Sequence, residues 1–590
     1  MKKILFTTIA ALLLSAAAFS QDYDDYAYEP TSSPAVTVNG EAGAKGRAWA
    51  GHYDEDDEWN SSISSQDNIK NIFMEGSAYG LLDVNYTGDV SDVNVKLKAD
   101  TSTIKDYPED ILEEATVRGY FGNWVVSGGK MKIVWGKGDK LHVLDNFNAN
   151  DYTDFIFPEY IDRRLAEPMF SLAYSAPNAS NIRLELVATP MMTADRFATS
   201  GALVPNAQKE LTSTVQNIVI TDTLNTLNDG GLTVNGSNVT VSSDAFSAIS
   251  DASSFSSDDL FENNIKSLKY AQGGARLTGT FSSIDWGFSY YYGHFKQPSP
   301  NFEKYIDSIS TYAASTEGQT YISQKYSSEI TAKTTEILAS GVTSDASTAA
   351  TLAYQAIVKE YASDLAKQGV FKVELPSLDY DRLQTFGFEL ATVIWKFNTR
   401  AELAYNLTED VAGDNPWVKN NSIAWVGGFD MDLPIHNLNV NIQETGTFVL
   451  NSDKIKDGDY AVYDVDYNSD DNYCINKLVV NVSDKWLHEK LTTECTAIYG
   501  IENKEWCVQP KIEYNPSEGL FLTLSGAYLF SNNENGEFYN FTADSTKSHR
   551  KMFSSGMPMP MASFACFFMC LYSPCIGIKN LGLVKDIIIL

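Results

Sequence analysis

Apolar and polar residues alternate one by one through much of this chain. In the clearest run, 395–405, the less polar positions are Trp395, Phe397, Thr399, Ala401, Leu403 and Tyr405. Because successive side chains of a strand point to opposite faces, such a run forms a strand with one apolar and one polar face. Similar runs lie at 182–188, 284–293, 438–443 and 520–530. Several are long enough to cross a bilayer when tilted, for which about 9–11 residues are needed.

Alternation alone fits two kinds of protein. In a soluble sandwich the apolar faces form a core, and in a membrane barrel they meet lipid. The connections separate the two, because short turns at 122–123, 179–180, 282–283 and 434–435 alternate with long connections. Aromatic residues also gather near the ends of the runs, as in outer-membrane barrels. We therefore predict an all-β fold, a transmembrane antiparallel β-barrel of about 16–18 strands.

Residues 1–20 have the pattern of a cleavable signal peptide, with Lys2 and Lys3, an apolar run over 4–14 and small residues before Gln21. The apolar run is too short to span a bilayer, which argues against the alternative of an amino-terminal anchor. An acidic segment, 21–35, follows, and the barrel is expected over 36–541. The predicted location is the bacterial outer membrane.

Two insertions interrupt the strand pattern. Residues 192–266 are rich in Ser, Thr, Asn and Asp and predict a long external loop. Residues 302–369 predict helices, because Phe302, Tyr305, Ile306 and Ile309 recur at helical spacing. This helical insertion in one long loop fits an outer cap, a lumen plug or a partner-binding arm. A plain solvated surface domain is the simplest interpretation.

The tail, 542–590, departs from the rest of the chain. It lacks alternation, and 551–590 holds five of the twelve methionines and three of the six cysteines. The chain ends Ile587-Ile588-Ile589-Leu590, whereas outer-membrane barrels usually end in an alternating strand with a final aromatic residue. One explanation is a frameshift that replaced the closing strand, and the alternative is an apolar anchor or hairpin over 562–578. An unclosed barrel would leave bare strand edges in lipid.

The composition narrows the functional classes. A net charge of −32 argues against nucleic acid as a partner. The six histidines are scattered, and the chain has no GxSxG, HExxH, EF-hand or CxxC pattern. The acidic run 54–58 is expected to be a solvated loop rather than a calcium site. We therefore expect no enzymatic activity, no cofactor and no metal.

The segment 128–177 combines several features in order. A strand ends at Trp135–Gly136, an Asn/Asp-rich loop runs to Asp154, and the basic pair Arg163–Arg164 precedes Pro168. This segment resembles a group of uncharacterised outer-membrane barrels of spirochaetes and proteobacteria, distantly similar to alginate-export porins. The resemblance implies a barrel fold and an outer-membrane location, and it implies little about a substrate. The missing aromatic terminus departs from that group.

Charged residues of the strands and of one loop are candidates for a solute path. Basic residues on polar faces predict a pore lining of Arg118, Lys130, Lys132, Arg183, Arg276, Lys396 and Arg400. The loop over 137–166 could fold into the lumen and set opposed charges across a constriction, with candidates Asp145, Asp151, Asp154, Arg163 and Arg164. The alternative is a structural loop whose carboxylates cap turns and pair with the arginines. A slightly basic lumen would favour anionic or carboxylated solutes.

These features together predict a porin-like channel for passive passage of small solutes. The expected partners are outer-membrane lipid, the outer-membrane assembly machinery and the small solutes, with no nucleic acid. The rival hypothesis is a surface-exposed adhesin or structural barrel whose long loops bind a partner. The sequence leaves the oligomeric state open.

Overall fold

The computed structural model describes residues 35–49, 73–177, 180–198, 233–234, 237–238, 264–301, 303–304, 315–361, 377–458, 464–531, 533, 536–538 and 581–588. The predicted signal peptide lies outside these residues, as do nearly all of the acidic segment, most of the 192–266 loop and most of the tail.

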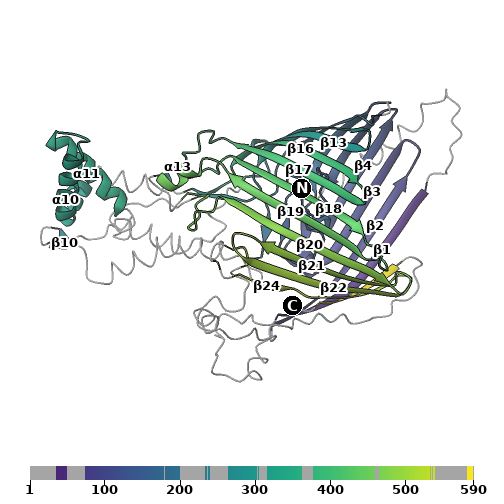
Figure 1. The fold of residues 1–590 in the computed structure, drawn as a ribbon. Helices are drawn as coiled ribbons and strands as arrows, with labels where there is room; N and C mark the ends of the chain where they lie inside the picture. The colour runs from purple at the N-terminus through teal and green to yellow at the C-terminus, as the bar shows by residue number, and fades with distance from the viewer. Residues whose placement is uncertain are drawn as a thin grey trace, which may run out of the picture.

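One 19-stranded sheet dominates the described chain (Figure 1). Consecutive strands of this sheet pair antiparallel from β1 to β22. Its strands are β1 (Ala35–Trp49), β2 (Phe73–Thr87), β3 (Ser91–Asp100), β4 (Leu112–Phe121), β5 (Trp124–Met131), β7 (Glu167–Ser175), β8 (Arg183–Thr189), β12 (Gln272–Phe281), β13 (Ile284–His294), β16 (Arg382–Ile394), β17 (Phe397–Thr408), β18 (Ser422–Asp432), β19 (Asn439–Val449), β20 (Cys474–Trp486), β21 (Leu491–Gly500), β22 (Glu505–Ser517), β23 (Leu520–Ser525), β24 (Tyr528–Phe530) and β25 (Leu581–Ile588).

The sheet closes into a barrel. Both β23 and β24 pair with β22, so they are two pieces of one position in the wall. β25 fills the gap between β23 and β1 and runs parallel to both. Because β1 and β23 point the same way, β25 has the same orientation relative to both. With β23 and β24 counted as one position, the 19 strands make 18 positions in the ring (19 minus 1). The predicted all-β barrel of about 16–18 strands is therefore confirmed.

The two ends of the barrel differ. At one end, here the turn end, short turns join β2 to β3, β4 to β5, β12 to β13, β16 to β17 and β22 to β23. The tightest contain residues with positive φ, such as Gly122 (φ +60°) and Ser282 (φ +58°), as two-residue hairpin turns require. At the other end, the loop end, the chain makes its long connections, including 132–166, 190–271 and 295–381.

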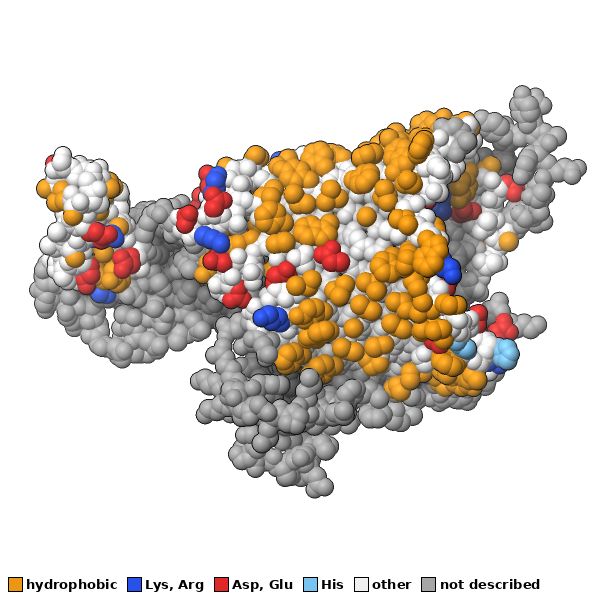
Figure 2. Space-filling model, in the orientation of Figure 1, with side chains coloured by type: hydrophobic (Ala, Val, Ile, Leu, Met, Phe, Trp, Pro, Cys, Tyr) orange, Lys and Arg blue, Asp and Glu red, His pale blue; other side chains and the backbone are white. Residues whose placement is uncertain are grey.

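Side chains of the wall alternate between the lumen and the outer surface. On β7, Met169, Ser171 and Ala173 are buried, whereas Phe170 is 51% exposed. Exposed wall residues elsewhere are mostly apolar and include Phe288, Phe386, Leu403 and Ile512. Hydrophobic side chains cover most of the visible wall, and charged groups gather at its loop end (Figure 2). An apolar outer face is the arrangement of a membrane barrel rather than of a soluble sandwich.

Helices occur in the connections. The insertion after β13 contains α9 (Thr316–Lys325), α10 (Ser327–Ser340) and α11 (Ala346–Glu360), which stand away from the wall at the loop end (Figure 1). They bury a small core of their own, with Ile322, Tyr326, Ala353 and Ile357 shielded from solvent. The helical insertion expected in one long loop is thus present. No helix among the described residues is long and apolar enough to cross a membrane.

The remaining described elements are short. They are α3 (Thr101–Lys105), η2 (Pro108–Asp110), β6 (Asp151–Tyr152), α4 (Tyr160–Arg163), β9 (Arg196–Phe197), β10 (Thr233–Val234), β11 (Ser237–Asn238), η5 (Leu268–Tyr270), β14 (Ser299–Asn301), β15 (Ser377–Asp379) and α13 (Ser452–Asp457).

The lumen contains a hydrophobic cluster. Trp135 and Phe147, from the connection between β5 and β7, pack there against wall residues that include Met169, Val187 and Tyr291. Trp135 and Phe147 are almost wholly buried, and their rings meet edge to face at 4.9 Å. Burying a large apolar side chain contributes about 1.5–3 kcal/mol. The connection is therefore held inside the barrel by packing as well as by polar contacts.

Candidate functional site

The connection 132–166, here called the inward loop, crosses the lumen and binds the wall at many points. Near its start, Trp135 Nε1 donates to Glu185 Oε2 on β8 at 3.2 Å. The Gly136 carbonyl accepts from Arg276 Nη2 on β12 at 3.3 Å. Asn146 Nδ2 donates to a hydroxyl on β16 at 3.3 Å. These contacts bind the first part of the loop to β8, β12 and β16, which follow β5 closely in the ring.

Glu402 on β17 is the main attachment point farther along the loop. Its Oε1 accepts from the Gly138 amide at 2.6 Å and lies 2.9 Å from His142 Nδ1, and its Oε2 accepts from the Val143 amide at 2.9 Å. The Glu402 side chain is fully buried. Gly136 has φ +115°, and an added Cβ there would overlap Glu402 Oε1. Glycine at this position therefore lets the loop backbone approach the carboxylate.

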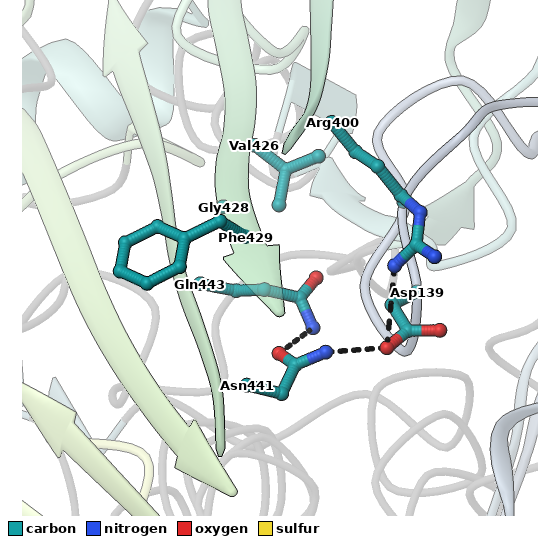
Figure 3. A pocket seen from close by; sticks show the side chains of 8 residues that line it. Asp139, Arg400, Val426, Gly428, Phe429, Asn441 and Gln443 are labelled. Atoms are coloured by element: carbon teal, nitrogen blue, oxygen red, sulfur yellow. Dashed lines mark hydrogen bonds and ion pairs between the residues drawn. The ribbon is translucent and has the colours of Figure 1, made fainter. Parts of the chain in front are cut away.

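Asp139 joins the inward loop to the opposite wall (Figure 3). Its carboxylate lies 3.5 Å from Arg400 Nη1 on β17 and accepts from Asn441 Nδ2 on β19. Gln443 Nε2 donates to Asn441 Oδ1 at 2.9 Å and extends this polar row along the wall. The next cation of the loop, Lys140, pairs with Glu494 on β21 at 2.8 Å. The tip of the loop is therefore tied to three neighbouring hairpins.

A buried ion pair organises the loop itself. Arg164 Nη2 lies 2.9 Å from Asp145 Oδ1, and Tyr160 donates its hydroxyl to Asp145 Oδ2 at 2.5 Å. Arg164 also donates to Asn150 Oδ1 at 3.1 Å. Burial alone would lower the pKa of Arg164, but the adjacent Asp145 carboxylate holds that pKa above its usual value. The pair fixes the end of the loop to its middle.

The segment around the short helix α4 is bound to the wall on two sides. Before it begins, Glu159 lies 3.7 Å from Lys511 Nζ on β22. Within it, the Ile161 carbonyl accepts from Lys132 Nζ at 3.2 Å, and Lys132 pairs with Glu113 on β4 at 2.9 Å. In ring order, β23, β25, β1, β2 and β3 fill the arc between β22 and β4. The segment around α4 therefore links β22 to β4 across this arc, through the side chains of Lys511 and Lys132.

A cavity of about 500 Å³ lies on the inner side of β2–β8. Its lining includes Asn94, Arg118, Tyr120 and Glu185 from the wall and Lys132 from the inward loop. Tyr120 donates its hydroxyl to Asp92 Oδ2 at 2.5 Å. The cavity has a polar lining of mixed charge, as a water-filled path for small polar solutes requires.

The structure brings together five of the seven basic residues predicted to line a pore. Arg118, Lys132 and Arg183 line the cavity. Arg276 and Arg400 face the inward loop from β12 and β17. Four of these five have a carboxylate within ion-pair distance: Arg276 with Glu389 (2.6 Å), Arg400 with Asp430 (3.0 Å), Lys132 with Glu113 (2.9 Å) and Arg183 with Glu185 (3.7 Å).

The structure places Lys130 and Lys396 away from the lumen. Lys130 lies on the face of β5 opposite to Ser127 and Met131, and it reaches Asp110 Oδ1 at 3.1 Å and the Leu112 carbonyl at 2.8 Å. Lys396 belongs to the two-residue turn between β16 and β17. Alternation assigns Lys396 to the lumen because the alternating pattern continues through the tight turn. It assigns Lys130 to the lumen because it places apolar Met131 on the outer face, whereas Met131 packs into the lumen cluster.

The five loop residues predicted to form a constriction pair within the loop or with nearby segments. Asp145 binds Arg164, Asp151 lies 3.2 Å from Arg196, and Asp154 pairs with Arg47 of β1. Arg163 donates to the Phe155 carbonyl at 2.8 Å. Asp151 and Asp154 also accept from backbone amides two or three residues ahead. This arrangement matches the alternative interpretation, a structural loop whose carboxylates cap turns and pair with arginines.

Sequence reasoning missed the residues that hold the inward loop in place. Glu402 is an unremarked polar-face acid in the sequence, and its partner Gly138 lies 264 positions earlier. The Asp139–Asn441 contact spans 302 positions. No group of His, Cys, Asp and Glu side chains suited to a metal ion occurs among the described residues.

No family model and no curated protein matches the chain. The chain is similar to solved structures of outer-membrane channels. One is the outer membrane channel DcaP of Acinetobacter baumannii, at 9% identity and a TM-score of 0.33, covering 85% of this chain and 96% of that one. Another is OccK11 (OpdR) of Pseudomonas aeruginosa, at 10% identity and a TM-score of 0.35, covering 85% and 92%. A third is OprB of Pseudomonas putida, at 8% identity and a TM-score of 0.32, covering 79% and 88%. At similarities this low, the barrel is established by the chain's own strand pairings, and the resemblance of 128–177 to uncharacterised outer-membrane barrels stays a prediction.

Proposed function

We propose that the protein is a porin-like channel of the bacterial outer membrane through which small solutes pass passively. The observation that carries this proposal is the inward loop, which enters a closed barrel and is fastened to strands on several sides of it. A loop in this position narrows a lumen without filling it, and its side chains then select solutes by size and charge. The apolar outer face supports placement in a membrane.

The remaining space favours one route through the barrel. The contacts of the inward loop given above fall on β1, on β4 and on strands from β8 to β22. We call the space between α4 and the inner faces of β1–β3 the passage. Together with the cavity along β2–β8 it would lead from the loop end to the turn end. We propose transport along this route and no catalysis.

The charge preference is a finer part of the proposal. The sequence predicts anionic or carboxylated solutes from an excess of basic wall residues. Carboxylate partners offset most of those residues, including Arg276 and Arg400. A preference for anions would then depend on lumen cations that have no such partner.

Planar-bilayer recording of the purified, detergent-folded chain tests the channel directly. We expect stepwise single-channel currents from a preparation whose unboiled band migrates differently from the boiled band on a gel. The adhesin hypothesis remains the second candidate, because α9–α11 stand away from the wall (Figure 1). A folded, heat-modifiable barrel that stays silent in bilayers would overturn the channel and favour the adhesin.

A further inference from the structure

The ammonium groups of two lysines on the wall of the passage have no ion-pair or hydrogen-bond partner among the described residues. Lys45 lies on β1 two positions before Arg47, which reaches Asp154 of the inward loop, so both side chains share the lumen face. Lys98 lies on β3 two positions after Lys96, whose partner Glu114 lines the cavity. Both lysines therefore lie on the lumen face of the part of the wall between β22 and β4.

The register places the two lysines on the strands that flank β2, at positions four residues apart along it. Lys45 faces Ser77 of β2, and Lys98 faces Leu81 of the same strand. Strands two positions apart are separated by about 10 Å and four residues along a strand span about 13 Å, so the two Cα atoms lie about 16 Å apart and both side chains must extend toward each other to reach one solute. Both ammonium groups act electrostatically on the same carboxylate, Asp100.

The neighbouring carboxylates are already engaged. Asp100 caps α3, accepting from the Thr103 amide at 2.8 Å and its hydroxyl at 2.6 Å. Asp154 is paired with Arg47. The lysines consequently keep donors available for a solute, since an ammonium group carries three.

An aromatic ring lies between the lysines. Tyr79 of β2 is paired with Gly43 of β1, and an added Cβ at Gly43 would come within 2.6 Å of Tyr79 Cε1, so the ring lies against the wall at the glycine. Its hydroxyl donates to Glu41 Oε1 at 2.9 Å, which fixes the ring there. A solute held by the lysines would have an apolar surface beside its carbon skeleton.

We infer that Lys45 and Lys98 form a binding subsite for small organic carboxylates on the wall of the passage and set its anion preference. The inference rests on the proposed channel function. Each lysine donates to a carboxylate oxygen of the passing solute, and the Tyr79 ring packs against its carbon chain. Two unpaired ammonium groups in a narrow, partly desolvated passage attract anions more strongly than the same groups in bulk water.

The test compares the double variant Lys45→Gln/Lys98→Gln with the wild-type chain in planar bilayers. We expect the anion-to-cation permeability ratio, taken from the zero-current potential in a KCl gradient, to fall by about threefold or more. Block of the chloride current by succinate should weaken to a similar degree, whereas uncharged succinamide should block neither protein. Lys396→Gln removes a lysine from a turn and serves as the matched control, with both quantities unchanged.

The possible outcomes separate the subsite from the channel. Unchanged selectivity and succinate block in a conducting double variant would overturn the subsite and leave the channel intact. Absence of current in the folded wild-type chain would overturn the channel itself. Lys98→Glu provides a second variant, since reversing one charge should turn the preference toward cations while the barrel stays heat-modifiable.

Discussion

Truncating Glu402 to alanine should release the tip of the inward loop. The carboxylate accepts from two backbone amides, at 2.6 and 2.9 Å, and contacts His142 at 2.9 Å in a fully buried position. Leaving a buried donor without an acceptor costs about 1–3 kcal/mol, so two orphaned amides cost the attached state about 2–6 kcal/mol. Since about 1.4 kcal/mol is a factor of ten, the detached state should gain at least tenfold in population.

Single-channel recording measures this release. Glu402→Ala should show larger or more variable conductance steps than the wild-type chain, because a detached loop blocks less of the lumen. Glu505→Ala is the matched control: it removes a buried carboxylate from β22 that accepts from the Phe538 amide at 3.0 Å and makes no hydrogen bond to the inward loop among the described residues, and its steps should match the wild type. Identical step sizes and noise in Glu402→Ala, with a heat-modifiable barrel, would refute the role of Glu402 as an attachment point.

Three further predictions address the loops. Gly136→Ala should reproduce the variable conductance of Glu402→Ala, because the φ of +115° disfavours alanine and the new Cβ would overlap the Glu402 carboxylate. Conductance steps of Gly136→Ala that match the wild type would count against this. Asp145→Asn leaves buried Arg164 without its carboxylate, at a cost of about 3–5 kcal/mol, and should lower the temperature at which the folded band is lost on a gel. Burial raises the pKa of Asp464 to about 6, above its ordinary value of 3.8, so the folded connection between β19 and β20 favours the protonated form. The stability of this connection should therefore fall as the pH rises through about 6. Proteolysis within 450–473 should be faster at pH 7.5 than at pH 5, and Asp464→Asn should reduce this difference.

The wall could be predicted from the sequence because each strand carries its own signal. The alternation through 395–405 assigns Leu403 outward and Glu402 inward without any knowledge of neighbouring strands. The same rule fails at Lys396, since a two-residue turn continues the alternation without belonging to either strand. It fails again at Met131, where the lumen holds a hydrophobic cluster and an apolar side chain points inward.

The site could be predicted only in part. The sequence indicates that 137–166 could enter the lumen and set opposed charges across a constriction, with a structural loop as the alternative. In the structure Asp145 and Arg164 bind each other. The wall positions that hold it, such as Glu402 and Asn441, lie hundreds of residues away in the chain. Nothing local distinguishes an acid that binds a loop from one that faces water. Only the closed ring brings these partners together.

The attachment of the inward loop also constrains how the barrel can form. The loop follows β5, yet it binds β17, β19, β21 and β22, which come later in the chain. It cannot reach its final position until those strands exist, so we expect the wall to form first. A newly completed barrel would then have a wide lumen until the inward loop binds the wall. During that time solutes would leak across the membrane without selection by size or charge. The duration of this leak is set by how quickly residues 132–166 find their partners across the lumen.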